Sequence, residues 1–388
     1  MPSAQCQARG ITPQRGLDSG GIASTVGSLL QHGGVSPAPD FHTYCFAFET
    51  LTECDERHLS DHIVRRYGFV STDVPAEAAA PLMGFPNHGP DRDEPYMGAF
   101  HTLHEHAYGQ AQADGMGQLW SGDRGDLMMG GWRLDYVKLL QSRDWSTLRT
   151  ELHSQRQLTG VSPSRAVLSH LCWPLLSRLW RKTRREGLAW PMRQWRQSSE
   201  AAFDYPEWIA PGYAQQWDLA EARAHHDARP NVTVYSQRQR YQQVFMPLFM
   251  RGMVWTERTQ ARFGLGFANP WSDRRLASFV MAAPQQVLNR AGVVDKELVR
   301  TAMRHIMPDA VRRNRELIVP TPLYRRAVRE WARETIQSLI TDSQVGARGY
   351  IDPDCLHTFY EALCAGEKND FRIWNTLTLE MWLRQYWS

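Results

Sequence analysis

Apolar and polar residues alternate along the first third of the chain in the manner of interleaved strands and helices. Short aromatic or aliphatic runs predict buried strands, and apolar positions repeated at helical spacing, such as Leu59, Ile63 and Tyr67, predict helices. In chain order, the predicted elements are a strand at 41–48, a helix at 55–67, a strand at 69–74, a helix at 101–112 and a strand at 118–120. This alternation predicts an α/β fold with a parallel sheet. After Leu134 the strand pattern fades, and the rest of the chain is predicted to be mostly helical.

A glycine-rich segment, Gly-Leu-Asp-Ser-Gly-Gly at 16–21, precedes this alternation. It predicts a tight turn that cradles phosphate and opens a helix, because glycines let backbone N–H groups approach an anion and a helix N-terminus carries partial positive charge. Asp18 would hold a Mg²⁺ ion that bridges phosphates. The alternative is a plain turn in which Asp18 or Ser19 caps the helix.

A second glycine- and aspartate-rich segment, Ser-Gly-Asp-Arg-Gly-Asp at 121–126, directly follows the predicted strand at 118–120. Open parallel sheets bind ligands at the carboxyl ends of their strands, so the two turns are expected to converge there. Asp123 and Asp126 are suited to hold Mg²⁺ or to orient an amine nucleophile, although aspartates in turns also serve as helix caps.

The residues before the first turn do not resemble the strand that such a turn normally follows. A central strand of a parallel sheet is buried on both faces and is typically a continuous aliphatic run, but residues 4–13 contain only Ile11, and Pro13 removes a backbone donor. We therefore expect the first strand to be missing or altered. A chain with this defect, as a truncated or incorrect N-terminus would leave it, is expected to be weakly stable or inactive.

The composition argues against several classes of protein. Of the 388 residues, 42% are hydrophobic and 22% charged, which is typical of a globular protein, and a net charge of +3 does not indicate a nucleic-acid partner. The sequence contains no apolar run of the roughly 20 residues that cross a membrane. Six scattered cysteines form no Cys-x-x-Cys pair, so we expect neither a zinc site nor a disulfide framework. We expect a cytoplasmic location. The basic segment 178–196 is expected to be a solvated helix face or a surface for an acidic or peptide partner.

Several motifs, in their order, resemble the synthetase domain of the glutamine-dependent asparagine synthetase family, which also includes lasso-peptide and β-lactam cyclases. The family's pyrophosphate loop Ser-Gly-Gly-Leu-Asp-Ser is matched by Gln-Arg-Gly-Leu-Asp-Ser at 14–19. The other matching segments are 42–48, 53–57, Asp-Glu-Pro at 93–95, 121–131, 257–258, 269–276, Lys296 and Thr-Pro-Leu at 321–323. Together they span residues 14–330, and their common order is far more specific than any single motif.

The resemblance implies one asparagine-synthetase-like domain over residues 1–388. A nucleotide-binding α/β core at about 14–135 would contain a parallel sheet of the adenine-nucleotide alpha-hydrolase-like (PP-loop ATP pyrophosphatase) type. A mostly helical part at 136–388 would follow.

The resemblance also implies an ATP-dependent ligase that adenylates a carboxylate, releases pyrophosphate and lets ammonia or an amine attack to form an amide. By position in the matching motifs, the nucleotide would contact Gly16, Asp18, Ser19, Gly20, Phe46, Ser121 and Gly122. Asp123 would act in the adenylate step, and Asp18 and Asp126 would hold Mg²⁺, which offsets charge on the leaving pyrophosphate. The substrate would be aspartate or another small-molecule or peptide carboxylate, and the partner a separate glutaminase subunit or a precursor peptide.

The sequence departs from the family pattern at three places. Gln-Arg at 14–15 replaces the first Ser-Gly of the loop, Arg124 replaces a small residue, and Leu317 stands where the family has a lysine that stabilises charge on the phosphates. Arg315 is the predicted substitute for that lysine, with Arg313 as the second candidate.

The glutaminase half of the family is expected to be absent. The chain begins Met1-Pro2, and Cys6 is not in the context of the N-terminal cysteine that glutamine hydrolysis needs. Two readings therefore stand beside the ligase that uses ammonia or an external amine. One is a degenerate or truncated member without catalysis, and the other is a lasso-peptide-type cyclase in which the attacking amine is internal.

Overall fold

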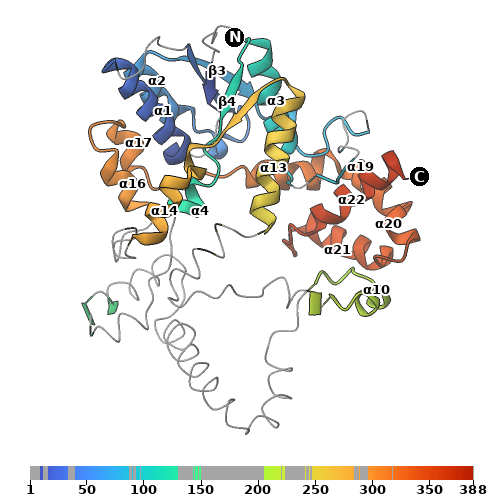
Figure 1. Ribbon diagram of the computed structural model, residues 1–388. Coiled ribbons are helices and arrows are strands. Elements are labelled where there is room, and N and C mark those ends of the chain that lie inside the picture. The colour runs from blue at the N-terminus through green and yellow to red at the C-terminus, as the bar shows by residue number, and fades with distance from the viewer. Residues whose placement is uncertain are drawn as a thin grey trace, which may run out of the picture.

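The computed structural model describes residues 9–11, 16–33, 40–86, 98–129, 205–219, 247–283, 296–316 and 318–387, with shorter pieces at 90, 93–96, 143, 145–146, 148–149, 221–222, 241, 244 and 288. Within these residues the chain forms a five-stranded parallel sheet in the order β3-β2-β1-β4-β5 (Figure 1). The strands are β1 (Arg9–Ile11), β2 (Phe41–Ala47), β3 (Val70–Pro75), β4 (Gln118–Trp120) and β5 (Gly266–Ala268).

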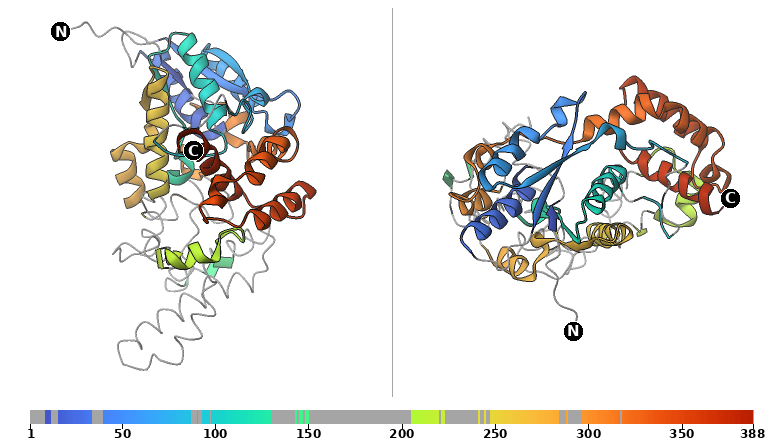
Figure 2. Two further views of the ribbon diagram at one scale, coloured as in Figure 1. Left: turned by 90° about the vertical axis from the view of Figure 1, so that its right-hand side faces the viewer. Right: turned by 90° about the horizontal axis from the view of Figure 1, so that it is seen from above.

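Different helices cover the two faces of the sheet, as the view from above shows (Figure 2). On one face lie α1 (Gly16–Gln31), α2 (Arg57–Tyr67), α4 (Gly125–Met129), α14 (Arg274–Ala282), α16 (Glu297–Ala302) and α17 (Asp309–Arg313), and on the other lie α3 (His101–Ala113) and α13 (Pro247–Arg262). Ile11 and Phe41 belong to the core on the first face, whereas Tyr44 and Leu119 belong to the core on the second. β2 and β4 thus contribute side chains to both layers, as a buried parallel sheet requires: Phe41 and Tyr44 from β2, and Trp120 and Leu119 from β4.

The predicted α/β class and the predicted elements of the first third are confirmed. The five elements predicted between 41 and 120 correspond to β2, α2, β3, α3 and β4. The fifth strand, β5, is not predicted, because it lies in the part of the chain after Leu134 where the strand pattern fades. Leu119 of β4 pairs with Phe267 of β5, so β5, although distant in the sequence, adds an edge strand to the sheet beside β4.

The prediction that the first strand is missing is wrong. β1 lies at the centre of the sheet, where Gly10 pairs with both His42 of β2 and Leu119 of β4. A Cβ atom added at Gly10 would lie 2.7 Å from the Tyr44 ring and 2.8 Å from the Leu119 side chain. Large side chains of the neighbouring strands therefore cover β1, which explains why this strand needs no aliphatic run of its own.

The C-terminal part is helical, as predicted, and has a core of its own. Its elements are α18 (Thr321–Arg326), a π-helical segment (Ala327–Trp331), α19 (Arg333–Thr341), α20 (Gln344–Ala347), α21 (Pro353–Ala365) and α22 (Ile373–Tyr386), with α10 (Pro211–Gln216) beside them. Trp208, Ile336 and Tyr360 are buried in this core. The basic segment 178–196 lies outside the described residues. No helix in the described part is long and apolar enough to cross a membrane.

We predict that Gly10→Ala lowers the free energy of unfolding by about 1–3 kcal/mol, because the new methyl group would overlap the Tyr44 ring and Leu119. Urea denaturation would measure the loss. Gly252→Ala is the matched control, because a Cβ atom there meets nothing within 4 Å and alanine favours the helix. Equal stability of the two variants would contradict a close-packed central β1.

Candidate active site

A cavity of about 290 Å³ opens at the carboxyl ends of β1, β2 and β4. Segments that are far apart in the sequence line it, among them the start of α1, the end of β2 with the loop that follows, α2, α3, the turn after β4, and residues 318–320 before α18. The predicted site residues that line it are Gly16, Asp18, Ser19, Gly20, Phe46, Gly122, Asp123 and Asp126. The structure thus brings most of the predicted site together, at the edge where parallel sheets bind ligands.

Two glycines let the turn after β4 lie directly against the start of α1. A Cβ atom at Gly122 would be 2.8 Å from the backbone nitrogen of Ser19, and one at Gly125 would be 2.2 Å from the carboxylate carbon of Asp18. No side chain fits in either gap, because real Cβ atoms do not approach other atoms this closely. Gly122 and Gly125 therefore let the turn after β4 pack against the start of α1, in addition to any approach to phosphate that the glycines allow.

Lys296 lies between the two predicted metal-binding carboxylates. Its Nζ atom is 2.7 and 2.6 Å from the carboxylate oxygens of Asp18 and 2.6 Å from Oδ1 of Asp126. The side chains of Lys296 and Asp18 are each 4% exposed, whereas that of Asp126 is 50% exposed. Burial acts to lower the pKa of the Lys296 ammonium, but the two carboxylates outweigh it and hold the pKa above its ordinary value. One positive and two negative charges therefore meet at this point.

Asp18 and Asp126 form a donor set that suits Mg²⁺, which usually takes one or two protein carboxylates and completes its coordination with phosphate oxygens and water. Lys296 already bridges the two carboxylates, so Mg²⁺ would have to bind them beside its ammonium or in its place. Within the described residues, no group of three or more His, Cys, Asp or Glu side chains is arranged to hold a metal. The Mg²⁺ site stays a prediction, and phosphate would have to supply its remaining ligands.

The first turn of α1 faces the cavity and already contacts a carboxylate. The N–H of Gly16 donates to Oε1 of Glu56 at 3.2 Å, and Glu56 lines the cavity. A helix N-terminus stabilises an anion through its unpaired N–H groups and partial positive charge. Glu56 therefore lies next to the place where phosphate is predicted to bind. Residues 14–15, where the loop departs from the family pattern, lie outside the described residues.

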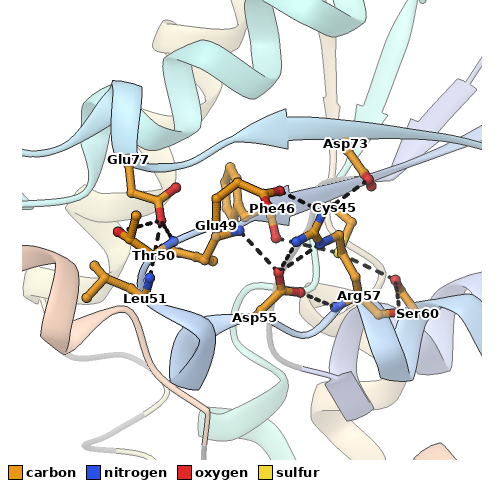
Figure 3. Close-up of polar contacts among 11 residues, drawn as sticks. Cys45, Phe46, Glu49, Thr50, Leu51, Asp55, Arg57, Ser60, Asp73 and Glu77 are labelled. Atoms are coloured by element: carbon orange, nitrogen blue, oxygen red, sulfur yellow. Dashed lines mark hydrogen bonds and ion pairs between the residues drawn. The ribbon is translucent and has the colours of Figure 1, made fainter.

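A network of polar contacts holds the loop between β2 and α2 (Figure 3). The Asp55 carboxylate accepts from the N–H of Phe48 at 3.2 Å and of Arg57 at 2.8 Å, and pairs with the Arg57 guanidinium at 2.6 Å. Burial acts to raise the pKa of Asp55, but these contacts outweigh it and hold the pKa below its ordinary value. Glu77 accepts from the backbone N–H groups at 50–51. The loop that carries the cavity's glutamate is thus fixed from both sides.

Ser121 forms the turn after β4 without itself lining the cavity. Its buried hydroxyl accepts from the N–H of Asp123 at 3.0 Å, and the Asn269 side chain donates to the Asp123 carbonyl at 3.0 Å. Asn269 begins the matching segment 269–276, so this contact joins two of the motifs. Phe46 lines the cavity at the end of β2 and is partly buried.

The predicted cationic substitute does not line the cavity. Arg315 is exposed, and Arg313 is exposed and pairs with Asp309 at 2.9 Å. Leu317 lies outside the described residues. A catalytic role for Arg315 therefore stays a prediction. Among the described residues of the lining, Arg124 is the one arginine or lysine.

The sequence alone assigns no part in this chemistry to His104, which lines the cavity from α3. Its ring packs edge-on against Phe46, with the centroids 6.1 Å apart. Burial lowers the pKa of His104, and the Asp123 carboxylate offsets part of this effect. No sequence signal singles it out, because a histidine among apolar helix positions is more often a core residue. Glu56 and Lys296 lie inside matching motifs, and only their order along the chain points to them.

A parallel sheet with a glycine-rich turn at the start of α1, facing a second acidic turn across a cavity, defines a protein with the adenine-nucleotide alpha-hydrolase-like fold. The chain belongs to the asparagine synthase family: the family model, described as "Asparagine synthase", matches residues 16–384. The family uses ATP. A comparison with curated proteins found no match to this chain.

We predict that Lys296→Met lowers the free energy of unfolding by about 3–5 kcal/mol, because it leaves Asp18 buried without its cation. Urea denaturation at neutral pH would measure the change. In the control Lys368→Met, which breaks an exposed pair with Glu207, the loss should be about 0–1 kcal/mol. Asp18→Asn combined with Lys296→Met should recover part of the loss, and a small loss in Lys296→Met alone would contradict the structural role of the pair.

We predict that Asp55→Asn removes stability at neutral pH and progressively less as the pH falls. The pKa of Asp55 is lower in the folded than in the unfolded chain, so its contribution is present above the unfolded value of about 3.9 and is lost as the pH falls toward the folded value. Urea denaturation between neutral and acidic pH would show the gap to the unsubstituted chain closing. Glu53→Gln, an exposed neighbour, is the control, and a gap that does not change with pH would count against the network in Figure 3.

Proposed function

We propose that this protein is an ATP-dependent amide-forming ligase, which activates a carboxylate as its adenylate, releases pyrophosphate and joins the acyl group to ammonia or an amine. The observation that carries the proposal is the convergence of the glycine-rich turn, the Asp18–Asp126 pair and Asp123 on one cavity at the carboxyl ends of the strands. Membership of the asparagine synthase family supports the same class of reaction.

In this proposal the triphosphate lies against the N-terminus of α1. Backbone N–H groups from Gly16 onward offset its charge, as helix N-termini do for bound phosphates. Asp18 and Asp126 would hold Mg²⁺, which when bound offsets charge on the departing pyrophosphate. Phe46, at the end of β2, would line the adenine pocket through its strand backbone.

The second half of the reaction involves the turn after β4. The amine nitrogen bonds to the acyl carbon, the bond from that carbon to the AMP oxygen breaks, and AMP leaves with the electron pair. The nitrogen must shed a proton, and Asp123, which lines the cavity one residue after the Gly122 contact with the first turn, is the carboxylate proposed to assist. The backbone N–H of Asp123 donates to the Ser121 hydroxyl and its carbonyl accepts from Asn269, and these two hydrogen bonds hold its backbone in place.

We predict that Asp126→Ala abolishes Mg²⁺-dependent ATP–pyrophosphate exchange, because it removes a carboxylate from the proposed phosphate and metal site. Asp123→Asn should leave the affinity for ATP within a few-fold and lower turnover by about 10²-fold, the scale of one lost acid–base or electrostatic group. Exchange would be measured with aspartate and other carboxylates, and ATP affinity by calorimetry.

Asp61→Ala is the control, because this exposed carboxylate on α2 lies outside the cavity lining and pairs with Arg65 at 3.1 Å, one turn away. It should leave both quantities unchanged. Normal exchange in Asp126→Ala would remove this residue from the site. ATP binding without exchange on any carboxylate would indicate instead a family member that has lost catalysis.

A further inference from the structure

A second hollow, of about 790 Å³, opens where the C-terminal end of α2 meets α17 and the turn before α17. These two helices pack against each other (Figure 1). The described residues that line the hollow are Arg66, Arg304, His305, Met307, Asp309, Arg312 and Arg313, and none of them lines the candidate active site. Toward the active-site cavity, α2 and α17 present Ile63, Val64 and Val311 instead. The hollow is therefore a separate feature of the surface.

The arginines that line this hollow outnumber its acids. Asp309 is the one carboxylate in the described lining, and it pairs with Arg312 at 2.7 Å and with Arg313 at 2.9 Å. Arg66 and Arg304 are exposed, and neither forms an ion pair with any residue that the structure describes. Like charges that are gathered in a concave surface raise the local potential and attract counter-ions. The hollow thus has an excess of positive charge.

Two hydrogen bonds fix the turn before α17 to the end of α2. The Arg66 guanidinium donates to the His305 carbonyl, and the Tyr67 hydroxyl donates to the Ile306 carbonyl, both at 2.5 Å. His305 is held with a φ of +73°, a left-handed conformation that is disfavoured for a residue other than glycine. The wall of the hollow is therefore formed before a ligand binds, which lowers the entropic cost of binding.

The lining also indicates the kind of anion. The centre of a protein interface is typically apolar, but Met307, the one apolar residue of the described lining, is only 1% exposed. Single-stranded nucleic acid is typically bound by aromatic rings on which its bases stack, and the lining that the structure describes has no Phe, Tyr or Trp. Guanidinium groups bind phosphate through two parallel hydrogen bonds, and each phosphate group offers up to two negative charges in a small volume. A compact phosphate-rich anion therefore fits this lining best.

We propose that this hollow binds a compact anion with two or more phosphate groups, at a site separate from the one proposed for ATP. Arg66 and Arg304 supply the charge that no carboxylate of the described lining offsets. Asp309 opposes the anion and limits its affinity. The inference does not depend on the proposed function.

The test is a calorimetric titration of the full chain with inorganic triphosphate in the absence of Mg²⁺. Arg304→Gln should weaken the binding by about 10-fold, the loss expected for one charged hydrogen-bonded contact. Asp309→Asn should tighten it by about 3- to 10-fold, because it removes the opposing charge. Arg325→Gln is the matched control, since Arg325 is also exposed and without an ion pair in the described part of the chain, and it should change the affinity by less than about twofold.

Arg304→Gln should keep the melting temperature of the unsubstituted chain, because its side chain is exposed and forms no ion pair with the residues described. Triphosphate bound at the proposed ATP site would persist in this variant, so unchanged affinity in Arg304→Gln would overturn the inference. An equal loss in Arg325→Gln would indicate general attraction to a positive surface, and weaker binding in Asp309→Asn would contradict the role of charge. Tighter binding of an oligo-aspartate peptide or a single-stranded oligonucleotide of equal charge would mean that the surface serves a macromolecule instead.

Discussion

A buried lysine between two aspartates holds the candidate site together. Asp18 comes from α1, Asp126 from α4 and Lys296 from the residue before α16, so one ammonium nitrogen joins segments that are up to 278 residues apart. Burying an unpaired charge is far more costly than burying a paired one, so each member makes the position of the others obligatory. The ion pairs of Lys296 are thus required for the start of α1 and the turn after β4 to meet. Gly122 and Gly125 let these two segments lie in close contact.

The order of the strands explains why this contact is possible. β1 lies between β2 and β4, so the turns that follow β1 and β4 leave the sheet side by side, with the end of β2 on the other flank. The N-terminus of α1 then faces the loop that carries Glu56, and the turn after β4 faces α3 and α13. The start of α1 and the turn after β4 in this way line one cavity. The remaining helices, in the C-terminal half, share a further core with Leu82, Tyr96 and Trp255, whereas Ile318 of the lining packs against the core on the first face of the sheet.

Much of the fold can be predicted from the sequence, because most of its elements carry the period of a strand or a helix. Leu59 and Ile63 are buried as their spacing predicts, and β2 has the aromatic run of a buried strand. β1 and β5 are missed because neither carries the apolar run of a buried strand. β1 has Gly10 at its centre, which Tyr44 and Leu119 cover, and β5 has Phe267 as its one large apolar residue.

The candidate site divides in a similar way. Residues in glycine-rich turns, such as Asp18 and Asp126, can be predicted, because such turns are typical of ligand-binding sites. Lys296, Glu56 and His104 reach the site from other helices and loops, and only the tertiary structure brings them there. The same holds for Arg124, whose sequence signal is a departure from the family pattern and whose left-handed backbone is visible only in three dimensions.

The most direct test of this account follows an oxygen atom. A carboxylic acid labelled with ¹⁸O in its carboxylate would be converted with ATP and an amine, and the AMP formed would be examined by mass spectrometry. If the carboxylate attacks the α-phosphorus in this cavity, one ¹⁸O atom must appear in the phosphate of AMP, and pyrophosphate must remain unlabelled. Label in inorganic phosphate with formation of ADP, or an amide formed with no label in AMP, would contradict an acyl-adenylate and with it the function proposed for the site.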